Sequence, residues 1–400
     1  MLKKTGLILT GGGARAAYQV GVLQAVAEMR RDVVPPTGAL PPNPFSVICG
    51  TSAGAINAAS LACGADDFDN TVAQLIDIWQ NVRVDQVYQA KNSDMIASGA
   101  RWLSLLSLGW IFAHKKLRPR SLLDNQPLMG LLSQHVRLDR LPSMLAQGHL
   151  DALAITASCY TTGEHVTFYD SHGEITPWVR NQRMAQRCQI DHSHLLASSA
   201  IPFVFPATPL NGPQGRTYFG DGSMRQMAPI SPVIHLGAER VFVIGAGRRG
   251  EPTAPRQGEA PYPSIANIAG HALSSIFLDT LAVDIERTRR INQTLALIPP
   301  QRRPESNLRH IELLVISPSQ RIDDIAVRHA SALPATVSSL LRILGASGSG
   351  RGNQGGALVS YLLFEAAFTQ ELIALGHADA VAQRDEIHRF FHWPSAASPA

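Results

Sequence analysis

The sequence predicts an α/β protein of three layers, in which helices cover both faces of a mostly parallel central sheet. Short apolar runs at 7–10 and 45–49 are each followed by a glycine-containing turn and then by a helical pattern, at 16–30 and 55–63. Strands that alternate with helices favour parallel pairing, because parallel neighbours need a crossover connection. Both turns then lie at the carboxyl ends of strands, where such folds place their sites.

Later segments continue this alternation as far as residue 245. Apolar runs bounded by polar residues predict more strands, and runs with a period near 3.6 residues predict more helices. The predicted strands are 153–157, 165–169 and 241–244, and the predicted helices are 71–90 and 193–200.

The composition changes after residue 245. A Gly- and Pro-rich stretch is followed by long helical patterns at 265–297 and 357–391, with a strand-like run at 311–316 between them. We therefore expect one domain over 5–245 and a mostly helical C-terminal region over 246–400. That region can be a second layer on the same core, a dimer surface or a lid, and the sequence leaves these open.

The turn at 50–54 carries the pattern of a serine nucleophile. Ser52 lies between Gly50 and Gly54 in G-x-S-x-G order, after a strand-like run and before a helix-like run. This setting exposes the serine hydroxyl and points helix N–H groups at charge that forms beside it. The pentapeptide alone also fits an inert turn serine.

The turn after the first strand contains Gly11, Gly12 and Gly13, followed by Arg15. Consecutive glycines leave backbone N–H groups uncovered, and such groups stabilise the oxyanion of an acyl-transfer intermediate. Arg15 adds a positive charge that can hold an oxyanion, bind a substrate phosphate or pair with a carboxylate. The sequence does not decide between these three roles.

Asp221 can supply the base that a serine nucleophile requires. Glycines at 220 and 222 flank it and permit a bent backbone that presents the carboxylate to Ser52. His235, His271 and His310 follow Asp221 and could complete a Ser…Asp…His order. We favour ordinary histidines there, because Asp221 and the glycine loop do not lie where that triad fold would place them.

These three segments, in this order, resemble the motifs of the patatin-like phospholipase family. The stretch 196–206 is also similar to a family segment that precedes the aspartate, and the resemblance covers about residues 5–245. Two positions depart from the usual family pattern: Ala16 replaces a glycine, and Ser223 replaces glycine or alanine. Both replacements are small, and the Ser223 hydroxyl could tune Asp221.

The resemblance implies a patatin-like three-layer fold and a lipid acyl hydrolase that uses a Ser-Asp dyad. It implies a lipid or acyl-ester substrate and no cofactor. The implied roles are Ser52 as nucleophile, Asp221 as general base, and an oxyanion hole at Gly11, Gly12 and Gly13 with Arg15 beside it.

Three alternatives remain beside this function. A soluble small-ester hydrolase or acyltransferase would use the same residues, and a non-catalytic, membrane-associated regulatory protein would retain a decayed site. The presence of all three segments argues against decay. The Gly11-x-Gly13-x-x-Ala16 spacing also occurs in dinucleotide sites, but no acidic residue ends a clear second strand about 20 residues on.

The segment 95–120 is apolar and then basic. It contains Trp102 and Trp110, followed by Lys115 and Lys116. One interpretation is a core helix whose last turn carries cations that favour the helix dipole. The other is a lid or membrane-contact segment, with aromatic rings at headgroup depth and cations on phosphates.

The overall composition is that of a globular protein, with 45% hydrophobic and 16% charged residues. The net charge of +4 and the lack of a dense basic stripe argue against nucleic-acid binding. We expect free thiols, a helix N-cap and not a metal site at 191–194, and neither a secretory signal nor a membrane-spanning helix. The expected location is cytoplasmic, with peripheral membrane contact; the oligomeric state stays open.

Overall fold

The computed structural model describes residues 3–33, 43–89, 121–212, 215–247, 265–306, 308–343 and 356–394. The segment 95–120 lies outside these residues, and so do Trp102, Trp110, Lys115 and Lys116 within it. The expectation of a lid or membrane contact there therefore stays a prediction.

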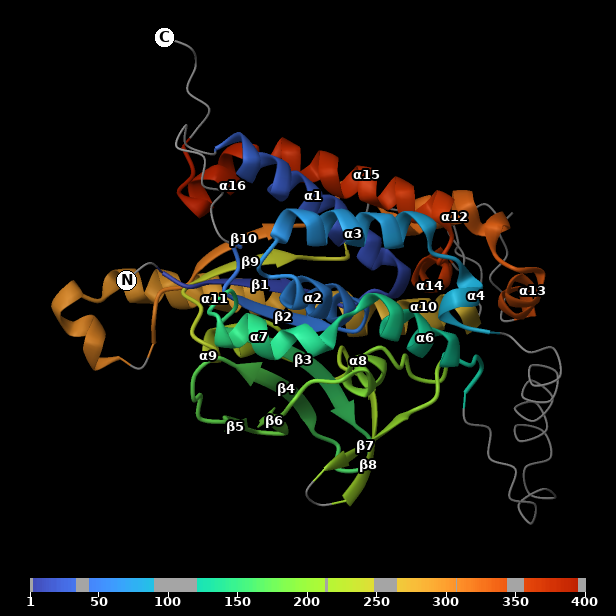
Figure 1. The fold of residues 1–400 in the computed structure, drawn as a ribbon, viewed down its shortest axis with the longest axis horizontal. Coiled ribbons are helices and arrows are strands. Elements are labelled where there is room, and N and C mark those ends of the chain that lie inside the picture. Colours follow the sequence, from blue (N-terminus) through green and yellow to red (C-terminus); the bar gives the residue numbers. More distant parts are fainter. Residues whose placement is uncertain are drawn as a thin grey trace, which may run out of the picture.

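Among the described residues, ten strands form one mostly parallel sheet, as predicted (Figure 1). The main order is β10-β9-β1-β2-β3-β4-β6-β5, and the first five of these strands are mutually parallel. Antiparallel pairing begins between β3 and β4, and β8 pairs with both β3 and β7. The strands are β1 (Thr5–Leu9), β2 (Val47–Thr51), β3 (Ala152–Cys159), β4 (His165–Ser171), β5 (Val179–Arg180), β6 (Arg183–Arg187), β7 (Thr208–Gly212), β8 (Gly215–Asp221), β9 (Arg240–Ile244) and β10 (Glu312–Ile316).

The helices follow the predicted alternation, with several refinements. The run 71–90 divides into two helices, and the pattern at 265–297 is two α-helices joined by a π-helical turn at Ser275–Asp279. The helices are α1 (Ala17–Asp32), α2 (Ala53–Cys63), α3 (Phe68–Asn81), α4 (Val84–Val87), α6 (Gln126–His135), α7 (Leu141–Ala146), α8 (His192–Ser198), α9 (Ser231–His235), α10 (Ile265–Ser274), α11 (Thr280–Leu297), α12 (Ile322–His329), α13 (Ala335–Ile343), α14 (Gly356–Leu362), α15 (Ala366–Ala382) and α16 (Arg384–Phe391).

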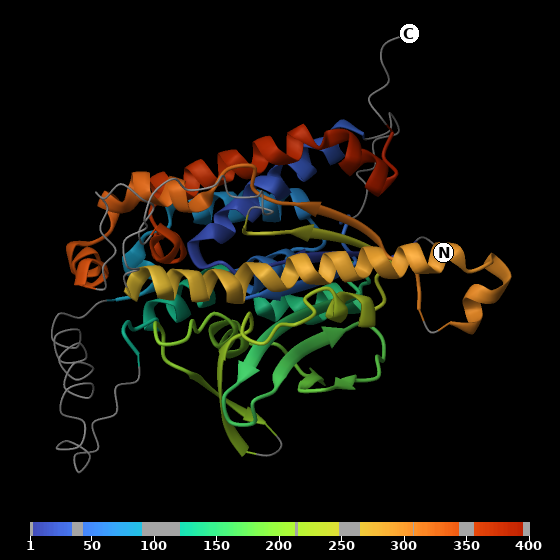
Figure 2. The same ribbon diagram turned by 180° about the vertical axis from the view of Figure 1, so that it is seen from behind.

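Alternate residues of the central strands point to two separate cores. Leu7 and Leu9 of β1 pack in a large cluster with α1, α2, α3 and α15, whereas Ile8 packs with α9 and α11 on the opposite face. Figure 1 shows α1, α3 and α15 above the sheet, and Figure 2 shows the long α10–α11 rod crossing the other side. This two-sided burial explains why these strands are apolar throughout their length.

Cys49, Cys63 and Cys159 are buried free thiols, whereas Cys188 is half-buried and also free. Within the described ranges, no single helix is long and apolar enough to cross a membrane. Helices α14 and α15 satisfy that length and composition only as a pair, and they are bent by 97° relative to each other.

Segments after residue 245 pack against the first half of the chain. Strand β10 extends the sheet beside β9, and α15 lies along α1 (Figure 1). The Tyr18 hydroxyl on α1 donates to Asp379 on α15 at 3.0 Å. These contacts make the C-terminal segments part of the layers that surround the sheet.

Arg15 forms a second link between the two halves. Its guanidinium is buried, donates to Asp323 Oδ1 at 2.5 Å and to Ser360 Oγ at 2.8 Å, and lies over the Tyr361 ring. A buried cation requires such partners, because leaving it unpaired in the interior costs several kcal/mol. The position of the glycine loop beside Arg15 therefore depends on residues more than 300 positions away.

We predict that Asp323→Ala lowers the free energy of unfolding by about 3 kcal/mol, because it leaves the Arg15 guanidinium buried without its carboxylate. Urea titration measures this value. Glu305→Ala is the control, since it breaks an exposed pair with Arg302 that is worth less than about 1 kcal/mol. Equal losses in the two variants would contradict this account of Arg15.

Candidate active site

Strand register brings the three motif segments to one place. Leu9 of β1 is aligned with Gly50 of β2, so the glycine loop and Ser52 leave neighbouring strands at the same edge of the sheet. Thr51 is aligned with Thr156 of β3, and the next β3 residue, Ala157, with Asp221 of β8. Residues 170 positions apart in sequence therefore converge at the end of β3.

Ser52 has a strained backbone, with φ 56° and ψ −131°. A non-glycine residue rarely adopts this conformation, which is typical of a serine on a strand-to-helix turn. Gly54 permits the turn, because a Cβ there would lie 2.3 Å from the carbonyl oxygen of Leu9. Ser52 is 1% exposed, and its Oγ donates to Asp221 Oδ2 at 2.6 Å.

The Asp221 carboxylate is completely buried. Burial raises the pKa of Asp221 to about 6, because the charged form loses its hydration. Hydrogen bonds from the Ser52 hydroxyl and from the Ser223 N–H, which is 2.8 Å from Oδ1, act in the opposite direction. The carboxylate is thus both desolvated and oriented toward Ser52.

The end of α8 holds both partners in position. Ser198 Oγ accepts from the Ser52 N–H at 2.8 Å and donates to the Thr156 carbonyl at 2.7 Å. The Ala200 carbonyl accepts from the Asp221 N–H at 2.9 Å. This gives a physical role to the 196–206 stretch, which the sequence marked only by its family resemblance.

His165 supports the aspartate turn from behind. Its Nε2 is 2.9 Å from the Gly222 carbonyl oxygen. Burial lowers the pKa of His165 to about 4, so the ring is neutral and donates to that carbonyl. Sequence analysis missed His165, because a single histidine in a strand gives no local signal.

The histidines considered for a triad do not contact the aspartate. In the described part of the chain, the hydrogen-bond partners of the Asp221 carboxylate are Ser52 and Ser223. His235 instead stacks on Trp178, and both His271 and His310 are exposed. A Ser…Asp…His triad through any of the three is therefore not formed.

The glycine loop presents backbone N–H groups beside Ser52. Gly13 has φ 55°, a left-handed conformation that favours glycine, and it lines the same cavity as Ser52. Among the residues that the structure describes, no protein group accepts the N–H of Gly12 or Gly13. The Ala53 N–H, at the start of α2, likewise has no protein acceptor there.

The expected place of Arg15 in the oxyanion hole is corrected. Of its three candidate roles, pairing with a carboxylate is the one found, because its guanidinium binds Asp323 and Ser360. This charge positions the loop and is not free for an oxyanion or a phosphate.

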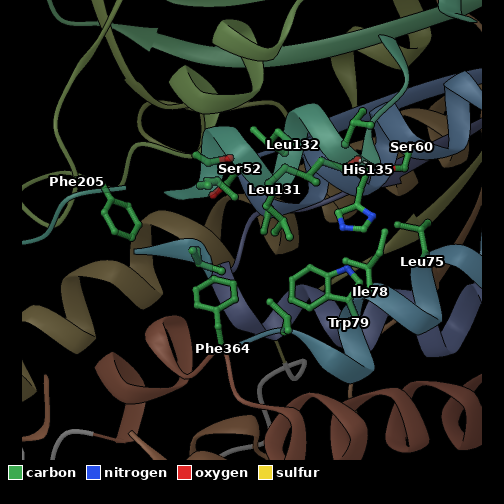
Figure 3. A pocket seen from close by; sticks show the side chains of 18 of the residues that line it. Ser52, Ser60, Leu75, Ile78, Trp79, Leu131, Leu132, His135, Phe205 and Phe364 are labelled. Atoms are coloured by element: carbon green, nitrogen blue, oxygen red, sulfur yellow. Dashed lines mark hydrogen bonds between the residues drawn. The ribbon is translucent and has the colours of Figure 1, made fainter. Parts of the chain in front are cut away.

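An apolar cavity extends from Ser52 between α2, α3 and α6 (Figure 3). It encloses about 710 Å³ counted to its open mouth, within the range of small-molecule sites. Ser199 also lines it, and the buried Ser199 hydroxyl has no hydrogen-bond partner among the described residues. Most of the remaining lining is apolar, including Leu75, Ile78, Trp79, Leu131, Leu132 and Phe364.

The residues at 191–194 cap a helix. Asp191 accepts from the His194 N–H at 3.1 Å and forms a capping box at the start of α8. Over the described ranges, no group of three or more His, Cys, Asp or Glu side chains is arranged to hold a metal ion.

Comparisons with known proteins agree with the motifs. The family model described as patatin-like phospholipase matches residues 7–234. No curated protein sequence matches the chain. Three solved structures are similar to it at low identity. VipD from Legionella pneumophila has 13% identity and a TM-score of 0.32, with 93% of this chain and 67% of VipD covered.

The other two similar structures are from human and Pseudomonas aeruginosa. Human GIVD cytosolic phospholipase A2 has 10% identity and a TM-score of 0.42, with 98% of this chain and 60% of that protein covered. ExoU from P. aeruginosa, solved with SpcU, has 15% identity and a TM-score of 0.26, with 93% and 70% covered. The chain thus spans less than two thirds of the human enzyme.

We predict that Gly54→Ala lowers the free energy of unfolding by about 2 kcal/mol, because its new methyl group must displace the end of β1. Gly130→Ala in α6 is the matched control. Nothing lies within 4 Å of a Cβ there, so alanine should raise the same free energy by about 0.5–1 kcal/mol. Urea titration of both variants measures the difference, and the same sign in both would refute the close-approach argument.

Proposed function

Because the chain belongs to the patatin-like phospholipase family, a family of lipid ester hydrolases, we propose that it cleaves acyl esters of lipids with Ser52 as nucleophile and Asp221 as general base. The observation that carries this proposal is the 2.6 Å hydrogen bond from Ser52 Oγ to a fully buried Asp221 carboxylate. The apolar cavity that begins at Ser52 supports an acyl chain as the group bound.

In the proposed first step, Ser52 Oγ attacks the ester carbonyl carbon while its proton moves to Asp221 Oδ2. The carbonyl oxygen becomes an oxyanion, which the N–H groups of Gly12, Gly13 and Ala53 stabilise. When the carbon–oxygen bond breaks, Asp221 returns the proton to the departing alcohol. An acyl-enzyme remains on Ser52.

In the second step, a water molecule attacks the acyl-enzyme and Asp221 accepts its proton. Collapse of the second oxyanion releases the carboxylic acid, and the proton on Asp221 returns to Ser52 Oγ. A carboxylate is a weak base for a serine proton, so its partial desolvation matters. The raised pKa of Asp221 brings it closer to the operating pH of a general base.

Two other functions stay as alternatives. A soluble small-ester hydrolase or acyltransferase would share the two steps but prefer short substrates, and a non-catalytic membrane-associated protein would form no acyl-enzyme. Membrane contact through Trp102, Trp110, Lys115 and Lys116, and a cytoplasmic location, also belong to the proposal. Turnover of phospholipid vesicles against short p-nitrophenyl esters distinguishes the two catalytic functions.

We predict that Ser52→Ala and Asp221→Asn each reduce kcat/KM for acyl esters by at least about a thousandfold, because each removes a member of the reacting pair. Circular dichroism should show retained folds. The control Ser133→Ala changes an exposed serine on α6 and should keep full activity. A fluorophosphonate probe should label the wild type and not Ser52→Ala; near-wild-type turnover by either variant would remove that residue from the dyad.

We predict that kcat/KM falls about tenfold per pH unit below pH 6 and is level above it. The sign follows from the raised pKa: Asp221 stays protonated up to about pH 6 and can accept the Ser52 proton only when ionised. A pH–rate profile with a neutral ester, over a range in which the fold is intact, measures this. A level profile from pH 5 to 7 would show that Asp221 is not the base.

A further inference from the structure

The apolar cavity follows the axis of α2. Ser52, Ile56 and Ser60 all line it, and they are spaced four residues apart on one face of the helix. Eight residues of an α-helix rise about 12 Å. The cavity therefore extends for about that distance from the hydroxyl of Ser52 toward the C-terminal end of α2.

The far end of the cavity is a single layer of side chains. Ser60, Leu75, Ile78 and His135 line the cavity, and the same four residues border a polar groove on the outer surface. Figure 3 shows the His135 ring beside Ile78, on the side of the cavity opposite Phe205.

Burial changes abruptly across this layer. Leu75 is only 2% exposed, Ile78 is half-buried and His135 is exposed. Beyond them the groove is lined by charged and amide side chains: Asp66, Asp67, Asn70, Arg137 and Arg140. An apolar chain gains free energy inside the cavity but not in that groove, because the groove is hydrated and polar.

We propose that His135, Leu75 and Ile78 end the acyl-binding site and limit the acyl chain to about ten carbons. This inference rests on the proposed function and adds a substrate class to it, esters of medium-chain acids. An extended chain of single bonds advances about 1.2 Å per bond, since three backbone bonds span about 3.6 Å. A cavity of about 12 Å therefore accommodates about ten carbons beyond the hydroxyl of Ser52.

Chain-length dependence gives a direct test. With p-nitrophenyl esters of 4 to 16 carbons in a fixed detergent micelle, kcat/KM of the wild type should rise about fourfold per carbon, the equivalent of about 0.8 kcal/mol per buried methylene. The rise should stop near ten carbons, and longer chains should lose activity because they must displace His135.

Two variants should move this maximum in opposite directions. Ile78→Trp fills the end of the cavity and should shift the maximum to about six to eight carbons. His135→Ala removes the ring and should raise the ratio of activity on 14 carbons to that on 10 carbons at least tenfold. Gln134→Ala is the control, because Gln134 is the exposed neighbour on α6 and does not line this cavity.

The ratio of two chain lengths is independent of the amount of folded enzyme. A wild-type rise that continues to 16 carbons, or an unchanged maximum in both variants, would overturn the inference while the proposed hydrolase function stands. If no ester is hydrolysed, the proposed function fails. Binding of fatty acids of 6 to 16 carbons to Ser52→Ala, measured by calorimetry, then decides the inference alone: affinity must peak near ten carbons and shift in the Ser52→Ala, Ile78→Trp double variant.

Discussion

A carboxylate kept entirely out of water, in contact with a serine hydroxyl, is the constraint on which the site depends. Burying Asp221 disfavours its ionised form, and the hydrogen bonds from Ser52 and from the Ser223 N–H offset part of that cost. The same desolvation strengthens the carboxylate as a base. One placement therefore both requires tight local packing and supplies the chemistry proposed for it.

The packing that meets this requirement comes from the ends of three elements. The strained Ser52 backbone is held between the Ser198 hydroxyl and the close contact of Gly54 with β1. On the other side, Ala200 and His165 hold the backbone around Asp221 through its own N–H and the Gly222 carbonyl. Because both partners are anchored to β3 and to the end of α8, their separation does not depend on flexible side chains alone.

The second half of the chain contributes to the same site. Arg15 anchors the glycine loop to Asp323 on α12 and Ser360 on α14, and Phe364 lines the cavity that begins at Ser52. A loop of three glycines has little conformational preference of its own, so a neighbouring fixed residue is a physical means of holding its N–H groups in place. Residues beyond 245 therefore shape both the loop and the cavity.

The sequence by itself determined the features that depend on local pattern. Apolar runs beside glycine turns predicted β1 and β2, and the motif spacing identified Ser52, Asp221 and the loop at 11–13. Hairpin β5–β6 was not predicted, since its two strands are short and mostly exposed and carry no clear alternation. Only the tertiary structure decided the partner of Arg15, the anchoring roles of Ser198 and His165, and the cavity between α2, α3 and α6. Those features are contacts between side chains from distant segments, and no pattern along the chain specifies which distant groups will meet.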